Sequence, residues 1–306
     1  SVSVKMNIDP IAMKPEENGN IQMMLTGPSC SISVNSPTAD YEIDWGDGMT
    51  ENPSGTGSKS YPHTYGDNGL YQVEIRNCGD VTSCMASTSC LVAYWSIGGS
   101  KVSSISFSGC SKLIYFGKDM FKNDMNRTSV SYILSNCTSL TSVDLTPLSG
   151  LVNVTDAYRM LYDCGNLTSV DLTPLSGWVN VTNTANFLSN CTSLTSVDLT
   201  PLSGWVNVTD AYGMLYDCGN LTSVDLTPLS YWTKMTRNTI LILGDSALSF
   251  ITVLSTTPFP LSSGALTNGN SCPIYVPDEA VETYKTATNW SAYASRIKPI
   301  SEKTES

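Results

Sequence analysis

A repeat of 27 residues occupies the middle of this chain. From Cys137 the phrase C-x-x-L-T-S-V-D-L-T-P-L-S recurs with almost no drift. Alternate repeats match best, so that residues 156–158 and 160–163 return as residues 210–212 and 214–217. A fixed period of this size is typical of a solenoid, in which one unit stacks on copies of itself and buries a continuous core. Five cysteines fall in register: Cys110, Cys137, Cys164, Cys191 and Cys218.

The charge balance is acidic and the charged fraction is small. The 306 residues carry a net charge of -11, and 14% of them are charged. Because such a chain repels phosphates, neither nucleic acid nor an anionic membrane is expected as a partner. No apolar run reaches the ~18 residues that a membrane-spanning helix requires. Ser1 begins neither a basic nor an apolar stretch, so we expect a signal peptide that was removed or none at all.

The pattern of residues divides the chain into three expected domains, 1–95, 96–245 and 246–306. In the first, residues 71–76 alternate apolar and polar, as a half-buried strand does. Asp47-Gly48 predicts a tight turn after a strand, and the Gly/Ser/Pro-rich residues 52–60 predict a loop. An all-β domain is therefore expected here.

Three motifs of this segment stand in order, W-G-D-G at 45–48, H-T-Y at 63–65 and G-L-Y-Q-V at 69–73. On these motifs the segment resembles the polycystic-kidney-disease (PKD) type of β-sandwich. The resemblance implies an immunoglobulin-like spacer or presentation domain of an extracellular protein, without catalytic residues.

In the second segment, the spacing L-x-x-L-x-L predicts one strand in each repeat, as in a leucine-rich repeat. The return limb ends in an apolar pair before the next cysteine, and the last such pair is Leu241-Ile242. Asp156 or Asp210 is expected to cap a short helix or 3₁₀ turn on that limb. Leucines, apolar pairs and cysteines are expected to share one core.

Residues 246–306 break the period. Residues 274–276 predict a last strand, and Asp278 is expected to cap a helix that runs to Ala287. A further helical turn is expected within residues 290–297. Because the end of a repeat array exposes its core, this segment is expected to be a C-terminal α/β cap.

The repeats and this ending resemble the BspA-type leucine-rich-repeat proteins of gut and oral bacteria, Bacteroides among them, and of their phages. The phrase C-T-S-L-T-S-V-D-L, the tripeptide Asn153-Val154-Thr155 and the ending 274–290 carry the resemblance. It implies a surface-exposed protein with a role in adhesion. The expected fold class is mainly β with short helices: a PKD/Ig-like sandwich, a leucine-rich-repeat solenoid and an α/β cap.

The repeat cysteines are expected to be buried thiols, because a column of five cannot pair completely. The other cysteines are spaced too widely for the usual zinc pattern, and Cys30 alternates with core residues of one strand. We predict no metal site and no cofactor. The sequence does not decide whether disulfides form among Cys30, Cys78, Cys84 and Cys90.

One aspartate in each repeat lies between two inward-facing apolar residues. In strand geometry these carboxylates form an outward column, in which each neighbouring pair costs about 1 kcal/mol if well solvated. Such a column either holds cations or a basic ligand, or consists of carboxylates that accept hydrogen bonds from nearby Ser, Thr or backbone donors. Its members are Asp144, Asp171, Asp198 and Asp225.

Trp178, Trp205 and Trp232 also share one repeat position. Stacked at the surface they form a platform for sugar rings, whereas turned inward they close the core at the turn. N-x-S/T sequons are plentiful, mostly at repeat positions where Asn satisfies turn backbone. They predict glycans only in a eukaryotic host, which the family resemblance disfavours. The sequons are at Asn126, Asn136, Asn153, Asn166, Asn180, Asn190, Asn207, Asn220 and Asn289.

No sequence motif indicates catalysis. The single histidine, His63, lies in the H-T-Y phrase, where a structural role is expected rather than activation of a nucleophile. There is no Gly-rich phosphate loop, no H-E-x-x-H and no serine elbow. Asp44 and Asp47 either order a turn or contribute to a Ca²⁺ site. We therefore expect a protein that is not an enzyme.

These observations favour a recognition or adhesion protein at a bacterial cell surface, extracellular, with a host protein or glycan bound through the repeats. The alternative is a structural decoration or fibre protein in the virion of a gut-bacterial phage. Either would be peripheral, without a transmembrane segment.

Overall fold

The computed structural model describes residues 19–53, 55–103, 105–236, 248–266 and 272–304. The chain divides into two compact units. Unit 1 comprises Ser1–Ile105 and Lys112–Asn123, and unit 2 comprises Ser106–Ser111 and Asp124–Ser306. The domain limits expected from the sequence, at residues 95 and 245, stay predictions.

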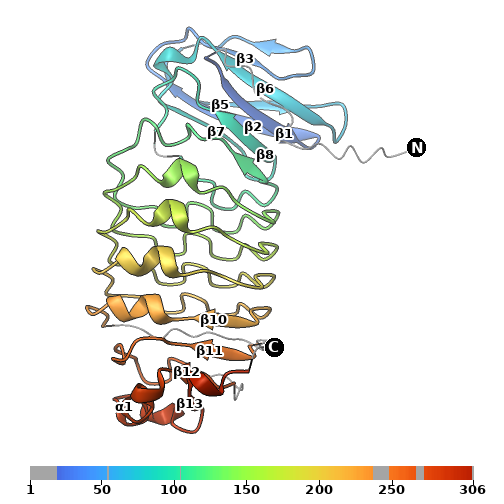
Figure 1. The fold of residues 1–306 in the computed structure, drawn as a ribbon. Coiled ribbons are helices and arrows are strands. Elements are labelled where there is room, and N and C mark those ends of the chain that lie inside the picture. Colours follow the sequence, from blue (N-terminus) through green and yellow to red (C-terminus); the bar gives the residue numbers. More distant parts are fainter. Residues whose placement is uncertain (1–18, 54, 104, 237–247, 267–271, 305–306) are drawn as a thin grey trace. The chain divides into compact units, whose positions relative to one another are not determined.

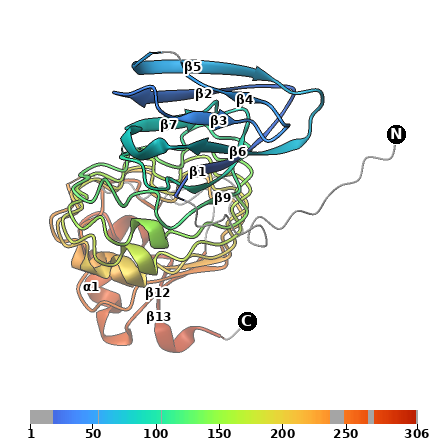
Figure 2. The same ribbon diagram turned by 90° about the horizontal axis from the view of Figure 1, so that it is seen from above.

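Unit 1 contains two β-sheets (Figures 1 and 2). One has the strand order β4-β3-β6-β1-β8-β9 and the other β5-β2-β7. Neighbouring strands are antiparallel, apart from the parallel pair β8 and β9. The strands are β1 Ile21–Thr26, β2 Ser29–Ser36, β3 Glu42–Asp44, β4 Thr50–Glu51, β5 Gly57–Thr64, β6 Leu70–Arg76, β7 Ser83–Ala86, β8 Leu91–Ser96 and β9 Tyr115–Phe116, with a 3₁₀ turn, η1, at Cys78–Asp80.

Alternating burial accounts for the strands of unit 1. In β6, Val73 and Ile75 are fully buried while their neighbours are partly exposed, which confirms the strand predicted over 71–76. The predicted turn is confirmed as well, since Asp47 Oδ1 accepts a hydrogen bond from Met49 N at 3.0 Å. The loop predicted over 52–60 is wrong in its second half, because β5 begins at Gly57 and pairs with β2.

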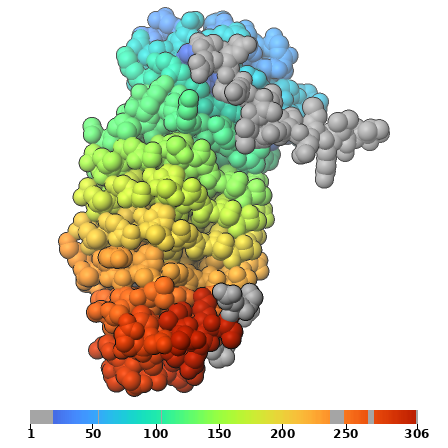
Figure 3. All heavy atoms as spheres, viewed as in Figure 1, coloured from blue at the N-terminus to red at the C-terminus, as the bar shows by residue number. Residues whose placement is uncertain are grey.

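Unit 2 is built from 27-residue coils that stack on one another. Figure 1 shows them one beyond the next from green to orange, and Figure 3 shows the same residues as successive bands. Hydrogen bonds join residues 27 apart: the N and Oγ1 atoms of Thr155 lie 2.8 and 3.2 Å from Thr128 O, and Thr182 repeats this on Thr155. The period of the sequence is therefore the period of these contacts.

The densest bonding between coils lies in the limb that precedes each cysteine. There, every second N–H group donates to a carbonyl of the next coil, as Tyr132 N does to Tyr158 O at 3.0 Å and Leu134 N to Met160 O at 3.0 Å. The helix or 3₁₀ turn predicted on this limb is wrong, because these N–H groups serve the neighbouring coil. One row of this limb has φ between 52° and 64°: Tyr132, Arg159, Asn186 and Gly213.

The two aspartates expected to cap that helix order turns instead. Asp156 Oδ1 accepts from Tyr158 N at 3.2 Å, and Asp210 Oδ1 accepts from Tyr212 N at 3.0 Å. A side-chain oxygen that accepts from the N–H group two residues later is the bond of an Asx-turn. These turns place residues 158 and 212 at the same point of their coils.

Identical side chains stack through the core of the array. The Cys164 thiol donates to Leu134 O at 3.2 Å, and the Cys191 thiol donates to Leu161 O at 3.3 Å, in each case 30 residues earlier. These two thiols are fully buried, as are the leucines of the repeated phrase to within 1%. The predicted shared core is confirmed at these positions. The pair Leu241-Ile242 lies outside the described residues.

The expected fold class, with its leucine-rich-repeat solenoid, is wrong. Such a repeat contributes one strand per coil to a continuous sheet, whereas the segments 140–145, 167–172 and 194–199 contain no strand. Isolated bridges link these coils instead, at Ser129, Asp156, Asn183 and Asp210. The described residues form three small separate sheets with short 3₁₀ turns and one α-helix.

The local reason lies at the end of the repeated phrase. Leu145 has φ -90° and ψ 0°, so the chain has left the extended conformation before the 3₁₀ turn begins at Thr146. Within the phrase, backbone bonds between neighbouring coils are few, and Thr168 N to Thr141 O at 3.0 Å is an example. The turns are η2 Thr146–Leu148, η3 Thr173–Leu175, η4 Thr200–Gly204 and η5 Thr227–Tyr231.

The end of unit 2 carries a parallel sheet of order β10-β11-β12-β13. The predicted strand 274–276 and the helical segment after it are confirmed. Asp278 does not cap that helix; its Oδ1 accepts from Ser301 N at 3.1 Å. Residues 290–297 hold one 3₁₀ turn and then enter a strand. The elements are β10 Ser223–Asp225, β11 Phe250–Thr252, β12 Ile274–Val276, η6 Asp278–Ala280, α1 Val281–Thr286, η7 Ser291–Tyr293, β13 Ile297–Pro299 and η8 Ile300–Glu302.

Candidate functional site

The aspartate column is exposed, and each carboxylate is engaged by its own turn. In all four repeats the Oδ1 atom accepts from the N–H group two residues later at 2.8 Å, as Asp171 does from Thr173. The Thr173 hydroxyl and N–H hold the pKa of Asp171 below its usual value. The sequence left two interpretations of this column: a site for cations or a basic ligand, or carboxylates that accept hydrogen bonds from nearby donors. The structure contains the hydrogen bonds of the second interpretation at all four positions, Asp144, Asp171, Asp198 and Asp225.

The tryptophan column lies in the core. Trp178, Trp205 and Trp232 are 0% exposed, and successive rings stack with centroids 6.0 and 6.4 Å apart. Each indole N–H donates to a leucine carbonyl 30 residues earlier, at 3.0–3.2 Å. Because no face of these rings reaches solvent, they offer no platform for a sugar and instead close the core at the turn.

The single histidine stabilises the hairpin of unit 1. His63 stacks on Trp45 with ring centroids 4.4 Å apart, and its Nε2 lies 2.8 Å from Asp47 Oδ2. Asp44 accepts from Gly46 N at 3.0 Å and pairs with Arg76. Both carboxylates proposed for Ca²⁺ thus have turn and ion-pair partners.

All ten cysteines are buried free thiols. The sequence left open whether disulfides join Cys30, Cys78, Cys84 and Cys90. In this structure all four are reduced. Burial raises the pKa of Cys84 to about 12, and that of Cys110 and Cys164 to about 12 as well. Such thiols carry little thiolate near neutral pH, so they are poor nucleophiles and poor metal ligands.

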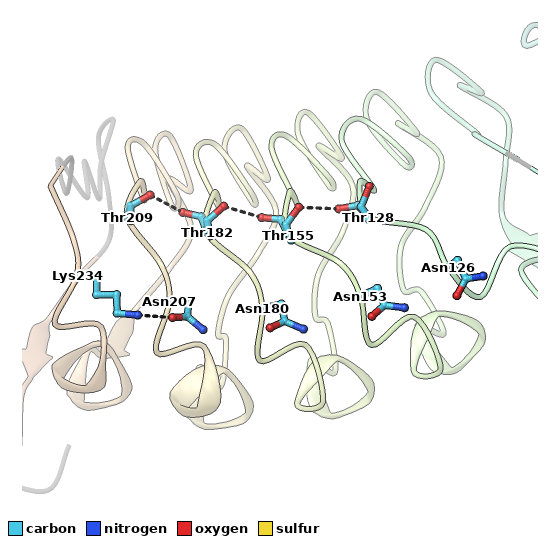
Figure 4. Close-up of a pocket in the computed structure, with 9 residues that line it drawn as sticks. All are labelled: Asn126, Thr128, Asn153, Thr155, Asn180, Thr182, Asn207, Thr209 and Lys234. Atoms are coloured by element: carbon cyan, nitrogen blue, oxygen red, sulfur yellow. Dashed lines mark hydrogen bonds between the residues drawn. The ribbon is translucent and has the colours of Figure 1, made fainter.

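A polar groove runs across the coils of unit 2, and we call it the Asn/Thr groove (Figure 4). One row of asparagines and one row of threonines follow its length, with Lys234 at one end, and its volume is about 590 Å³. Each coil contributes one residue of each type, two positions apart in the sequence. The lining residues are Asn126, Thr128, Asn153, Thr155, Asn180, Thr182, Asn207, Thr209 and Lys234.

The threonine row is fixed by its own hydrogen bonds. The hydroxyls of Thr155, Thr182 and Thr209 donate to the carbonyl of the threonine 27 residues earlier, at 3.0–3.2 Å. A hydroxyl has one hydrogen to donate and two lone pairs that accept. Because the hydrogens are used between coils, these oxygens can offer a ligand only acceptor sites.

The asparagine row is oriented in the same way. Asn180 Nδ2 donates to Val152 O at 3.2 Å, and Asn207 Nδ2 donates to Val179 O at 2.9 Å. At the end of the row, Lys234 Nζ donates to Asn207 Oδ1 at 2.5 Å. The carbonyl oxygen Oδ1 of Asn180 takes no part in the bond to Val152. The groove is therefore rich in acceptors along most of its length.

Sequence reasoning assigned these asparagines to turn backbone. Asn180 and Asn207 do bond turn carbonyls, those of Val152 and Val179 in the preceding coil. That reasoning missed that asparagines and threonines of successive coils line one groove. The signal was present in the recurring tripeptide of Asn153-Val154-Thr155 type, whose central valine is buried. A buried residue between two polar ones places both polar residues on the same outer surface.

No protein-family model matches the chain, and neither does any curated protein. Among the described residues, no helix has the length and apolar character needed to cross a membrane. In the same ranges, no three His, Cys, Asp or Glu side chains gather as metal ligands. The Asn/Thr groove is a candidate site because its two polar rows are aligned over four coils.

Proposed function

We propose that the protein is a non-enzymatic, surface-exposed recognition protein that binds a neutral, extended glycan along the Asn/Thr groove. The observation that carries this proposal is the alignment of the two polar rows, one Asn and one Thr per coil over four coils. A site that repeats at a fixed spacing suits a polymer, because successive units of the polymer can make the same contact.

The acceptor-rich lining selects the chemistry of the ligand. Threonine oxygens and asparagine carbonyls accept hydrogen bonds, and the hydroxyl groups of a sugar supply donors. An anionic polymer is repelled by a chain of net charge -11. A neutral polysaccharide is the class that satisfies both conditions.

An apolar row next to the asparagines supports the same class. Val152, Val179 and Val206 each precede a groove asparagine and are 50%, 48% and 45% exposed. Sugar rings present C–H faces as well as hydroxyls, so an exposed methyl row beside a polar one is a favourable surface for them. The resemblance to surface proteins of the BspA type, and the host ligands that it implies, agrees with this assignment.

The test begins with a glycan array probed with the full chain, followed by calorimetry on the polysaccharide that binds. Replacing both groove hydroxyls in Thr155→Val/Thr182→Val retains side-chain shape but removes two acceptors. We expect binding at least about tenfold weaker, since one or two hydrogen bonds are lost.

A matched control is available in the same coils. Thr168 and Thr195 donate the same type of bond to a carbonyl 27 residues earlier, at 3.1 and 3.4 Å, but lie outside the groove. Thr168→Val/Thr195→Val should therefore cost similar stability and leave binding unchanged. Equal loss in both variants, or an array on which no glycan is bound, would contradict the proposal.

A further inference from the structure

A second cavity lies on unit 2, and we call it the tyrosine slot. It has a volume of about 440 Å³ and draws on three successive coils. Tyr158 lies at one side and Tyr212 at the other, with Ala185 of the middle coil between them. The lining residues are Tyr158, Arg159, Asn183, Ala185, Asn186, Asp210 and Tyr212.

The 54-residue period produces the slot. Residues 158, 185 and 212 occupy one row, because Arg159 N donates to Ala185 O at 3.0 Å and Asn186 N donates to Tyr212 O at 2.7 Å. Ala185 stands between the two tyrosines of this row, so the middle coil lacks the ring that its neighbours carry. Ala185 is 5% exposed, and its small side chain leaves the space between the two tyrosines open.

The spacing of the coils sets the width of the slot. Backbone hydrogen bonds join the three coils along this row, and segments joined in this way lie about 4.8 Å apart, so the backbones of Tyr158 and Tyr212 are about 9.6 Å apart. One ring in carbon contact with both walls needs roughly 4 Å on each side. A single puckered ring fits this width.

The floor and rim are polar. Asn183 Oδ1 accepts from Ala185 N at 3.0 Å, a bond in which its amide nitrogen takes no part. Asp210 Oδ1 accepts from Tyr212 N at 3.0 Å, which fixes the carboxylate at the rim. Asn186 adds a second amide. Donors and acceptors therefore surround the space between the two rings.

Arg159 occupies an unfavourable backbone position beside the slot. Its φ is 52°, in a row where Asn186 and Gly213, residues that tolerate left-handed backbone, also stand. Its guanidinium carbon lies 4.5 Å from the Tyr162 ring centre and 5.2 Å from that of Tyr158. Within the described chain, Arg159 Nε is buried without a hydrogen-bond partner.

We infer that the tyrosine slot binds one pyranose ring, held between Tyr158 and Tyr212 with its hydroxyls on Asn183, Asn186 and Asp210. Aromatic walls contact the C–H faces of a sugar, and the polar floor accounts for its edge. An aromatic side chain of a protein partner would offer no hydrogen-bonding groups to the amides of Asn183 and Asn186 while shutting them off from water, which is costly. Neutral hexoses and uronic acids have the same pyranose ring. The positive charge of Arg159 beside the slot favours the carboxylate of a uronic acid.

The test uses the full chain with glucose, galactose, N-acetylglucosamine and glucuronate as probes, measured by saturation-transfer NMR and titration. A single ring should bind in the millimolar range. Ala185→Tyr continues the tyrosine row and fills the slot, so binding should disappear. Tyr212→Ala removes one wall and should weaken binding about tenfold. Arg159→Gly copies Gly213 and should weaken glucuronate more than the neutral sugars.

Tyr216→Ala is the matched control, since Tyr216 is 41% exposed in the same coil but does not line the slot. Equal effects of Tyr212→Ala and Tyr216→Ala would overturn the inference, as would an unchanged affinity in a folded Ala185→Tyr variant. Absence of binding by all four sugars, or tighter binding of phenol than of any sugar, would also overturn it. Because no groove residue is altered, the slot and the Asn/Thr groove can fail separately.

Discussion

The two units of this chain use polar and aromatic side chains in opposite ways. In unit 1 each distinctive contact occurs once: His63 stacks on Trp45, and Arg76 pairs with Glu42 and Asp44. In unit 2 the same contact recurs over successive coils, as the stacked indoles and the Thr rows do. A substitution in unit 1 therefore removes one interaction, whereas a substitution in unit 2 interrupts a column and disturbs two neighbours.

The difference also separates structure from recognition. In unit 1, His63 contacts Trp45 and Asp47 of the W-G-D-G motif, and these contacts stabilise the hairpin. The Asn and Thr rows of unit 2 use a side-chain donor of each residue to bond the preceding coil, and their side-chain oxygens line the groove. Repetition thus turns a stacking bond into a surface of aligned acceptors, which is why both proposed sites lie on unit 2.

The largest expected effect comes from removing the last strands of the array. Deletion of residues 272–306 removes β12, β13 and α1 with the fully buried Trp290, and it exposes Ile251 of β11. Because each coil buries its face only against neighbours, unit 2 should lose protection from hydrogen exchange while unit 1 keeps it.

Deletion of residues 301–306 is the control for this truncation, since it leaves β13 intact. It should change the melting temperature and solubility far less. Equal behaviour of the two truncations would show that the terminal strands do not protect the array. It would also contradict the contrast between unit 2, whose contacts repeat from coil to coil, and unit 1, whose contacts occur once.

A single core substitution should come next in size. Trp205 is fully buried between Trp178 and Trp232, so Trp205→Ala should lower the free energy of unfolding of unit 2 by about 3–5 kcal/mol. Trp45→Ala in unit 1 is the counterpart. Hydrogen exchange followed by peptide mass spectrometry should place each loss in its own unit. A loss of protection in both units from either variant would contradict the comparison.

The sequence predicted the contents of the core better than the path of the backbone. Cys, Leu and Trp columns follow from a strict period, because equivalent residues must face equivalent surroundings. The return limb escaped prediction because its left-handed row holds Tyr132 and Arg159 beside Asn186 and Gly213. Only the last two are residues that normally indicate such backbone, so the row resembled a helical segment.

The candidate sites were harder to predict for a related reason. Sequence reasoning selected the Asp and Trp columns because their chemistry is distinctive, yet the carboxylates order turns and the indoles are buried. The Asn/Thr groove consists of common residues whose importance lies in alignment. The tyrosine slot depends on Ala185, a residue noticeable only as a missing tyrosine within the 54-residue period.

A smaller effect is expected from the buried thiols at alkaline pH. Burial raises the pKa of Cys164 in the folded protein from 9.0 to about 12. Stability due to the neutral thiol is thus complete below about pH 9 and is lost as pH rises toward 12. In this window Cys164→Ser should reduce the pH dependence of unfolding by up to about 1.4 kcal/mol per pH unit. The free energy of unfolding is measured by denaturant titration at several pH values. If its slope against pH is the same in the variant, this thiol ionises freely in the folded coil.

The smallest expected effect is that of the aspartate column. Asp171→Asn/Asp198→Asn retains an oxygen that accepts from Thr173 N and Thr200 N, and it removes two neighbouring charges from the column. Melting temperature at low salt should therefore stay constant or rise slightly, and the rise should vanish at 1 M salt, where charges are screened. Asp67→Asn in unit 1 is the counterpart, because Asp67 Oδ1 accepts from Gly69 N at 2.7 Å and has no column around it. That variant should gain nothing at low salt. A gain of equal size in both would mean that the net charge of -11 is being relieved rather than repulsion within the column. A loss of stability in the array variant alone would show that the carboxylates themselves, and not only their acceptor oxygens, hold the coils in place.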